Sequence, residues 1–189
     1  MLEPEGSLPE IYVQPGEAHI VTQPSILKTL LGSCVGITFW APQHGLAALC
    51  HPMLPQCPVG RLGRITTTAC LRYVDYAIHD LARKFDACGA QRGQVHVKLF
   101  GGCDVLPDAR QSLRPTIGRL NSEAAMKVLD TEGFRVCTSC LGGNSGITIL
   151  FNTRNGEVLL KRLCQAHGTD VARRAEDSWE AAPTRTSKG

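Results

Sequence analysis

The feature of the sequence that most constrains the fold is a pair of apolar, β-branched runs separated by a turn. The first run extends from Leu27 to Trp40 with a break at Gly32-Ser33, and the second extends from Leu46 to Cys50. The tetrapeptide Pro42-Gln43-His44-Gly45 between them has the composition of a turn. This pattern predicts a β-hairpin.

Helical periodicity occurs twice farther along the chain. Apolar residues recur at three- and four-residue spacing from Thr66 to Cys88 and from Ile117 to Glu132, and a glycine follows each segment. Other runs have strand composition, and these are residues 95–100, 134–140, 147–151 and 158–163. An Asn-Gly turn at Asn155-Gly156 joins the last two runs into a second hairpin. The sequence therefore predicts a mixed α/β (α+β) fold with two main helices.

The two ends of the chain differ in composition from this central part. Residues 1–18 are rich in proline, glycine and glutamate around a short Ile-Tyr-Val, and residues 165–189 carry few large apolar side chains. We expect a single domain over residues 19–164. A flexible leader or an edge strand is expected before it, and a flexible tail after it.

Charge and hydropathy exclude several functional classes. The 20 basic and 17 acidic side chains give a formal net charge of +3, which provides no electrostatic basis for binding nucleic acid or a membrane surface. No apolar run approaches the roughly 18–20 residues that span a bilayer. The start of the chain is acidic and contains proline, unlike a signal peptide, so a cytoplasmic protein is expected.

Nine cysteines are a high number for a chain of 189 residues. In a reducing cytosol the default is free thiols that pack as small apolar side chains, as expected of Cys50, Cys70 and Cys88 on apolar faces. Cys137 and Cys140 form a Cys-x-x-Cys pair, but no second ligand pair with short spacing accompanies it. Core or strand positions are therefore favoured over a zinc or redox site.

One cysteine differs from the others because of its place in the first hairpin. If residues 41–44 form the loop, Trp40 faces Gly45 and Cys34 lies directly opposite His51, with Cβ atoms about 4.5–5.5 Å apart. The same register gathers the apolar residues of both strands on the other face. The pairing predicts a thiol beside an imidazole.

A thiol and an imidazole in this arrangement have a definite chemistry. An imidazolium lowers the pKa of a neighbouring thiol, the thiolate is a nucleophile, and the histidine can later protonate a leaving group. A bend at Gly32-Ser33 can direct backbone N–H groups at an oxyanion. The alternative is that Cys34 is one more buried thiol and His51 an ordinary polar residue at a strand end.

Short segments over roughly residues 15–164 also match a known pattern. They are Leu30-Leu-Gly-Ser-Cys-Val-Gly-Ile37, His51-Pro-Met-Leu-Pro55, Arg72-Tyr-Val-Asp-Tyr-Ala-Ile78, Phe100-Gly-Gly102, Thr116-Ile-Gly118 with Asn121, Leu141-Gly-Gly-Asn144, and Phe151-Asn-Thr153 with Gly156. These segments resemble the signature segments of the CheD family, the chemoreceptor glutamine deamidases of bacterial chemotaxis.

The resemblance implies a nucleophile at Cys34 and a catalytic histidine at His51. It implies that selected glutamine side chains of methyl-accepting chemotaxis receptors are converted to glutamate, with no metal or organic cofactor. Backbone near Gly32 and Ser33 is expected to hold the oxyanion, and Asn144 is expected to be a turn residue or to contact the substrate. The implied fold is a layered sandwich of mixed sheets related to toxin deamidases, and a CheC-type phosphatase is a partner of several members.

The family's third catalytic residue is a threonine shortly before the cysteine. The aligned position in this chain is Lys28, with Thr29 next to it. Thr29 is assigned to orient His51, and Thr38 and Ser33 remain alternatives.

These observations predict a cysteine amidohydrolase that acts on protein glutamine. One alternative is another thiol hydrolase, either a papain-like protease or a methylesterase of the same receptors. The other is a non-catalytic adaptor that binds receptor helices or a phosphatase. Product analysis distinguishes the three.

Overall fold

The computed structural model describes residues 7–58, 67–104, 115–163 and 179–182, which form two five-stranded sheets and the helices beside them. The first sheet contains, in spatial order, β1 (Glu10–Tyr12), β3 (Ile26–Leu31), β8 (Ile147–Asn152), β9 (Val158–Arg162) and β10 (Glu180–Ala181). The second sheet contains β2 (Ala18–Val21), β5 (Leu46–Cys50), β4 (Val35–Ala41), β6 (His96–Gly101) and β7 (Val136–Leu141). The helices are α1 (Thr67–Cys70), α2 (Val74–Ala87) and α3 (Ile117–Thr131), with 3-10 turns η1 (Pro42–His44) and η2 (Arg92–Gln94).

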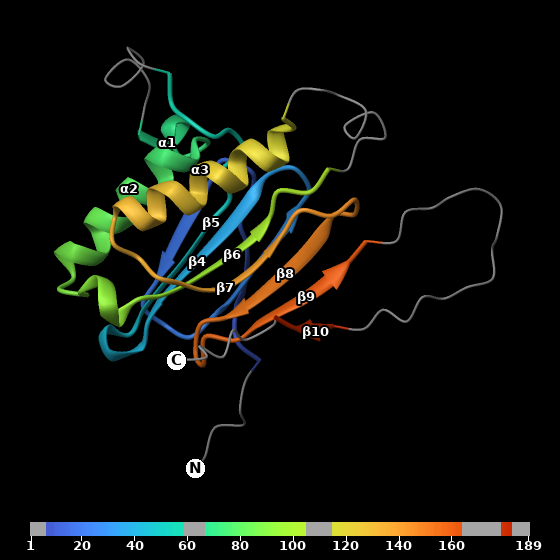
Figure 1. Ribbon diagram of the computed structural model, residues 1–189. Coiled ribbons are helices and arrows are strands. Elements are labelled where there is room, and N and C mark those ends of the chain that lie inside the picture. Colours follow the sequence, from blue (N-terminus) through green and yellow to red (C-terminus); the bar gives the residue numbers. More distant parts are fainter. Residues whose placement is uncertain (1–6, 59–66, 105–114, 164–178, 183–189) are drawn as a thin grey trace, which may run out of the picture.

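The elements are arranged in three layers (Figure 1). Helices α2 and α3 cover one face of the second sheet, and the apolar side chains between them include Ile37, Phe39 and Phe85. The first sheet covers the other face, with Leu49 and Phe151 in the second apolar cluster. Each sheet combines antiparallel pairs with one parallel pair, β1 with β3 and β6 with β7. The predicted mixed α+β sandwich with two main helices is confirmed.

The first hairpin forms from β4 and β5, but its register differs from the prediction. Ala41 pairs with Leu46 and Ile37 pairs with Cys50, so the loop consists of residues 42–45. Ala41 continues the strand because its side chain is buried, and Gly45 closes the turn with a φ of 58°, a conformation that favours glycine.

The predicted pairing of Cys34 directly opposite His51 is therefore wrong. Because the loop moves by one residue, every cross-strand pair shifts by two, and each side chain keeps its predicted face. The apolar face carries Val35, Ile37 and Phe39 with Leu46, Ala48 and Cys50, and it packs under the helices.

The run from Leu27 to Trp40 is not one strand. Its first half is β3 in the first sheet, and its second half is β4 in the second sheet. The break at Gly32-Ser33 is the place where the chain passes from one sheet to the other. Cys34 therefore lies in the loop that joins β3 of the first sheet to β4 of the second sheet.

The helix expected from Thr66 to Cys88 is interrupted at residues 71–73. The amides of Met53 and Leu54 both donate to the carbonyl of Arg72, at 2.8 and 3.0 Å, and Leu54 forms an isolated β-bridge with Tyr73. These residues leave the helix because they pair with the chain that follows β5. The helix predicted over residues 117–132 forms as α3.

Two short strands lie within the segments expected to be flexible. Residues 10–12 run parallel to β3 as β1, and residues 180–181 pair with β9 as β10, so both segments add edge strands to the first sheet. Most of the expected tail, residues 165–178 and 183–189, lies outside the described residues, as do residues 1–6 of the leader.

Candidate functional site

The site is built around a histidine whose ring is held at one nitrogen. His51 follows β5 and is 1% exposed, and its Nδ1 lies 2.7 Å from Oγ1 of Thr29 on β3. The Thr29 hydroxyl donates its single proton to the carbonyl of Val13, at 2.7 Å. The hydroxyl must therefore accept from Nδ1–H, which leaves the lone pair of the neutral ring on Nε2.

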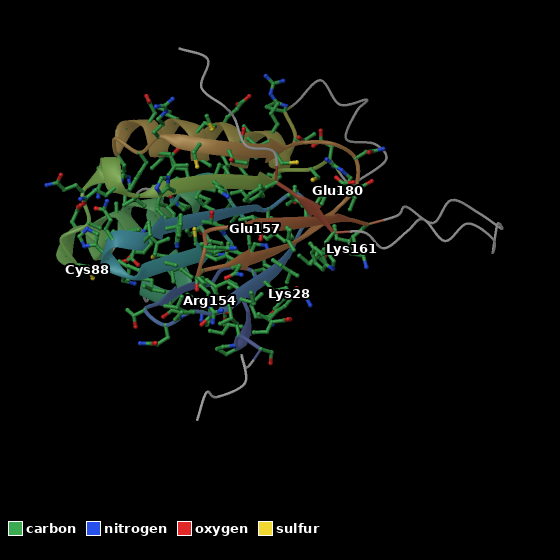
Figure 2. The ribbon with its side chains drawn as sticks, turned by 90° about the horizontal axis from the view of Figure 1, so that it is seen from below. Lys28, Cys88, Arg154, Glu157, Lys161 and Glu180 are labelled. Atoms are coloured by element: carbon green, nitrogen blue, oxygen red, sulfur yellow. The ribbon has the colours of Figure 1, made fainter. Side chains whose placement is uncertain are left out.

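The alternation of β3 decides which residue reaches this ring. Thr29 is buried on the inner face of the strand, whereas Lys28 faces outward and pairs with Glu10 at 3.1 Å (Figure 2). Neighbouring residues of a strand point to opposite faces, so the two cannot exchange roles. Of the alternatives, neither Thr38 nor Ser33 hydrogen-bonds to the ring in the described structure.

The backbone of His51 is held by the N-terminal segment. Its amide donates to the carbonyl of Glu17 at 2.9 Å, and its carbonyl accepts from the amide of Gly16 at 2.7 Å. With the carbonyl of Val13, this segment supplies three of the contacts that fix the histidine. Sequence reasoning missed these residues because the segment has no clear periodicity, and its only signal was the short Ile-Tyr-Val.

The backbone around Cys34 is held by hydrogen bonds to three successive carbonyls. Gly32 accepts from the amide of Cys103 (2.8 Å), Ser33 from Nδ2 of Asn121 (2.9 Å), and Cys34 from the amide of Gly102 (2.8 Å). In a trans peptide the C=O and the following N–H point in opposite directions, so the amides of Ser33 and Cys34 point away from these partners. Neither amide donates to another residue that the structure describes, which leaves two adjacent N–H groups available.

Cys34 and His51 occupy diagonal positions on the same face of the β4–β5 ladder. The amide of Val35 donates to the carbonyl of Pro52 at 3.2 Å, which continues the ladder and places Met53 opposite Cys34. Diagonal neighbours in such a ladder are about 7–8 Å apart, still within reach of large side chains. Within the described residues no hydrogen bond joins the thiol to the ring, and Nε2 of His51 is buried without a partner.

Burial sets the protonation of both groups. It raises the pKa of the partly exposed Cys34 thiol, with the residue's own backbone acting in the opposite direction. It lowers the pKa of His51 to about 4, and the Val13 backbone opposes this shift. At neutral pH the resting pair is a thiol and a neutral imidazole. The expected thiolate beside an imidazolium is therefore corrected, because an imidazolium would be poorly solvated here.

Glycines allow the close contacts that fix this loop. A Cβ on Gly101 would collide with the carbonyl oxygen of Cys34, and a Cβ on Gly118 would lie 2.6 Å from the carbonyl oxygen of Gly102. Gly101 has a φ of 95° and Gly102 a φ of 63°, which also favour glycine. The Gly-Gly sequence at the end of β6 thus brings both the Cys34 loop and α3 against the end of the strand.

Asn144 lies exposed in the loop after β7, at the same end of the sheets. The amide of Gly142 donates to the carbonyl of Gly101 at 2.9 Å, and the amide of Asp104 donates to the carbonyl of Gly143 at 2.8 Å. This loop is therefore separated from the Cys34 loop by one strand end. A contact between Asn144 and a substrate stays a prediction.

The cysteines outside the site have different surroundings. None of the eight that the structure describes forms a disulfide, and Cys50 and Cys70 are buried as expected. Cys88 is exposed at the edge of the molecule, so its predicted apolar position is wrong (Figure 2). The reason is that α2 ends one residue earlier, and Cys88 forms its C-terminal cap.

The Cys-x-x-Cys pair lies on β7, where its two thiols have different partners. The sulfur of Cys137 lies 3.1 Å from the carbonyl of Val97, and the sulfur of Cys140 lies 3.7 Å from the guanidinium of Arg162. No group of three potential metal ligands occurs among the residues that could be searched. Both thiols are placed as strand residues.

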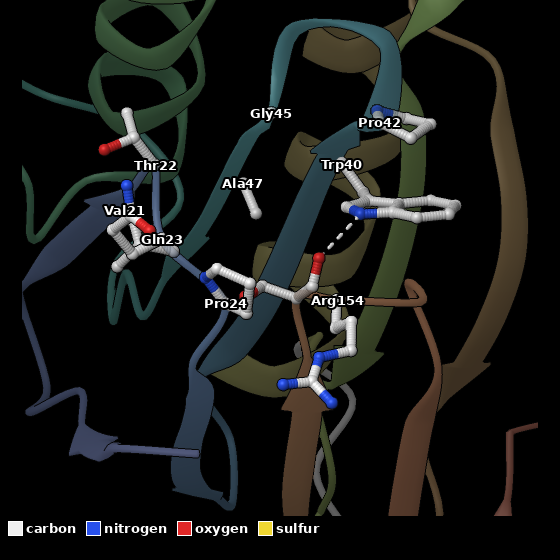
Figure 3. A pocket seen from close by; sticks show the side chains of 10 residues that line it. Val21, Thr22, Gln23, Pro24, Trp40, Pro42, Gly45, Ala47 and Arg154 are labelled. Carbon is white, nitrogen blue, oxygen red and sulfur yellow. Dashed lines mark hydrogen bonds between the residues drawn. The ribbon is translucent and has the colours of Figure 1, made fainter. Parts of the chain in front are cut away.

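Two cavities lie at the opposite end of the strands. One of about 150 Å³ is lined by Trp40 and Arg154, and the Trp40 Nε1 donates to the carbonyl of Thr153 at 2.9 Å (Figure 3). The other, of about 510 Å³, is lined by residues that include Trp40, Lys98 and Cys137. Trp40 is six strand residues from Cys34, about 20 Å away. These cavities are therefore remote from the histidine and the thiol.

Fold and site together define a mixed α+β protein in which a cysteine, a histidine and a threonine approach one another at one end of two packed sheets. A family model described as "CheD chemotactic sensory transduction" matches residues 53–162, more than half of the chain. The chain belongs to the CheD family.

Curated relatives agree with this assignment. The chain is 40% identical over 156 residues to "Probable chemoreceptor glutamine deamidase CheD 2" of Geobacter sulfurreducens, which covers 82% of this chain and 91% of that protein. It is 32% identical to the "Probable chemoreceptor glutamine deamidase CheD" of Maridesulfovibrio salexigens, over 86% of this chain and 97% of that one. A protein of the same name from Oleidesulfovibrio alaskensis is 33% identical over 94% of this chain and 84% of its own.

Among solved structures, the Bacillus licheniformis hypothetical protein YfiH aligns with a TM-score of 0.41 and 12% identity, over 67% of this chain and 49% of that chain. In the part of the chain that the structure describes, no helix is long and apolar enough to cross a membrane.

Proposed function

We propose that this protein deamidates glutamine side chains of chemoreceptors, the activity in the names of its relatives. The observation that carries the proposal is the hydrogen bond from Nδ1 of His51 to Thr29. It leaves the basic Nε2 free, on the face of the ladder that also carries Cys34. Two backbone amides beside the thiol, which donate to no other residue that the structure describes, complete the set of groups that amide hydrolysis requires.

The first half of the reaction makes a thioester and ammonia. His51 Nε2 takes the proton of the Cys34 thiol as the sulfur attacks the side-chain carbonyl carbon of the glutamine. The amides of Ser33 and Cys34 donate to the oxyanion. The imidazolium then gives its proton to the nitrogen, the C–N bond breaks, and ammonia leaves.

The second half regenerates the thiol. Nε2 of His51 takes a proton from water, and the resulting hydroxide attacks the thioester carbon. The C–S bond breaks, the imidazolium returns its proton to the sulfur of Cys34, and the product is a glutamate side chain. Because the resting pair is neutral, His51 acts as a general base in both halves.

The exposure of the candidate site fits a protein substrate. Cys34 is partly exposed in the loop between β3 and β4. A glutamine on a receptor helix can reach such a loop. Because the substrate is the cytoplasmic part of a receptor, we place the protein in the cytoplasm, with a CheC-type phosphatase as a second partner.

The test is to incubate the purified protein with the cytoplasmic fragment of a methyl-accepting chemotaxis receptor. Peptide mass spectrometry should show glutamine converted to glutamate at specific positions, with one ammonia released for each. Cys34→Ala should abolish conversion, and Cys88→Ala, which removes an exposed and remote thiol, should not.

Other products would identify other functions. Backbone cleavage would indicate a protease, and methanol release from a methylated receptor would indicate an esterase. Binding without turnover would indicate an adaptor. Full conversion by Cys34→Ala would refute the assignment of the nucleophile.

A further inference from the structure

A buried asparagine on α3 connects the two segments that carry the thiol and the imidazole. Asn121 is 0% exposed, and its Nδ2 donates to the carbonyl of Ser33 and to the carbonyl of Met53, both at 2.9 Å. Ser33 directly precedes Cys34, and Met53 is two residues beyond His51. One side-chain amide thus uses both of its protons to hold the two segments at one spacing.

These contacts lie where strand pairing no longer fixes the spacing. The regular ladder between β4 and β5 ends at the pair Ile37 and Cys50, and the hydrogen bond from Val35 to Pro52 follows it at 3.2 Å. The residues that carry the chemistry lie at or beyond this end. Without further pairing, the segments that continue β4 and β5 would be free to move apart. Asn121 joins these two segments at that point.

The contact with Ser33 also sets the direction of a backbone donor. The carbonyl of Ser33 and the N–H of Cys34 belong to one planar peptide unit. Because Asn121 holds the carbonyl on one side, the N–H is fixed on the other side, where the proposed oxyanion forms. The side chain therefore controls both the thiol–imidazole spacing and one oxyanion donor.

The unpaired oxygen of Asn121 argues against a role in stability alone. Its Oδ1 is buried and has no partner among the described residues, an arrangement that opposes folding. An apolar residue at this helix position would avoid that unpaired acceptor. What the asparagine provides instead is a fixed relative position of the two segments that it joins.

We infer that Asn121 is a positioning residue that holds Cys34, His51 and the Cys34 amide in register for deamidation, an inference that rests on the proposed function. Asn121→Asp keeps the shape but sets an acceptor against two carbonyls, and Asn121→Ala removes the bridge. Displacing a reacting group by about 1 Å can lower a rate about 100-fold, so kcat should fall by that order while KM changes less than about threefold.

The matched control is Thr116→Ala. Thr116 caps the same helix by accepting from the amide of Arg119 at 3.2 Å, so its loss weakens α3 without touching the bridge. At a temperature where all variants are folded by circular dichroism, Thr116→Ala should keep kcat within about twofold. Equal losses of kcat in Thr116→Ala and Asn121→Ala would overturn the inference.

A second readout does not depend on deamidation. The rate of Cys34 alkylation by iodoacetamide, followed by mass spectrometry, should also fall in the Asn121 variants, because His51 no longer lies in register to take the proton. Unchanged alkylation together with unchanged kcat refutes the positioning role. Absence of deamidation in the wild type, with alkylation still sensitive to Asn121, refutes the proposed function alone.

The wild-type protein supplies a test that is independent of variant folding. Side-chain amide protons of Asn121 that hold two carbonyls should exchange with solvent far more slowly than those of the exposed Asn155, measured by NMR. Equal exchange rates would show that the bridge does not persist in solution, and the inference would fail.

Discussion

The buried neutral histidine predicts a specific loss of stability in mild acid. An unfolded histidine has a pKa near 6.5, and burial lowers the pKa of His51 to about 4 in the folded protein. Between these two values the unfolded state binds more protons, so the free energy of unfolding falls as the pH falls. The contribution of His51 is complete above about pH 6.5 and is lost as the pH approaches 4.

The size of this effect follows from the pKa difference. Each pKa unit corresponds to 1.36 kcal/mol, so the full contribution of His51 is about 3 kcal/mol, of which about 2 kcal/mol is lost between pH 7 and pH 5. Such a loss is a large fraction of the stability of a domain of this size.

The assay is urea denaturation followed by circular dichroism at pH 7, 6 and 5. His51→Gln removes the titrating ring, and His44→Gln removes an exposed histidine of the η1 turn as a matched control. Between pH 7 and pH 5, the free energy of unfolding should fall by about 2 kcal/mol more in the wild type and in His44→Gln than in His51→Gln. Parallel losses in all three proteins would refute the conclusion that His51 is held neutral by burial.

Three further predictions follow from the site. Thr29→Val keeps the shape but removes the acceptor for Nδ1 of His51, so kcat should fall about 10- to 100-fold in the deamidation assay, whereas Thr29→Ser should retain most activity. Because burial raises the pKa of Cys34, its alkylation rate should keep rising above about pH 8.5, and a plateau near neutral pH would indicate a preformed thiolate. Gly118→Ala should lower the free energy of unfolding by about 1–3 kcal/mol through its collision with Gly102, and an unchanged urea midpoint would contradict that packing.

Much of the fold was predictable because it follows local periodicity. The helix over residues 117–132, the two hairpins and the apolar face of β4 and β5 all have patterns that a sequence window contains. The hairpin register was not predictable in the same way. It depended on whether Ala41 belonged to the strand or the loop, and its burial under the helices decided that.

The candidate site was only partly accessible from sequence for the same reason. Cys34 and His51 stand in recognisable segments. The choice between Lys28 and Thr29 depended on which of the two side chains lies on the inner face of β3. The contact of Val13 with Thr29 depends on an edge strand from a segment with no periodicity. Contacts between distant segments leave no local pattern.

The division of the site between two sheets determines when, during folding, a newly synthesised chain can become active. Thr29 lies on the first sheet, whereas His51 follows a strand of the second, so their hydrogen bond exists only after the sheets dock. Such long-range contacts form late, because chain entropy opposes them until the surrounding core has assembled. A half-folded polypeptide would carry the thiol but no oriented base. If the proposed mechanism holds, catalysis therefore requires the completed fold.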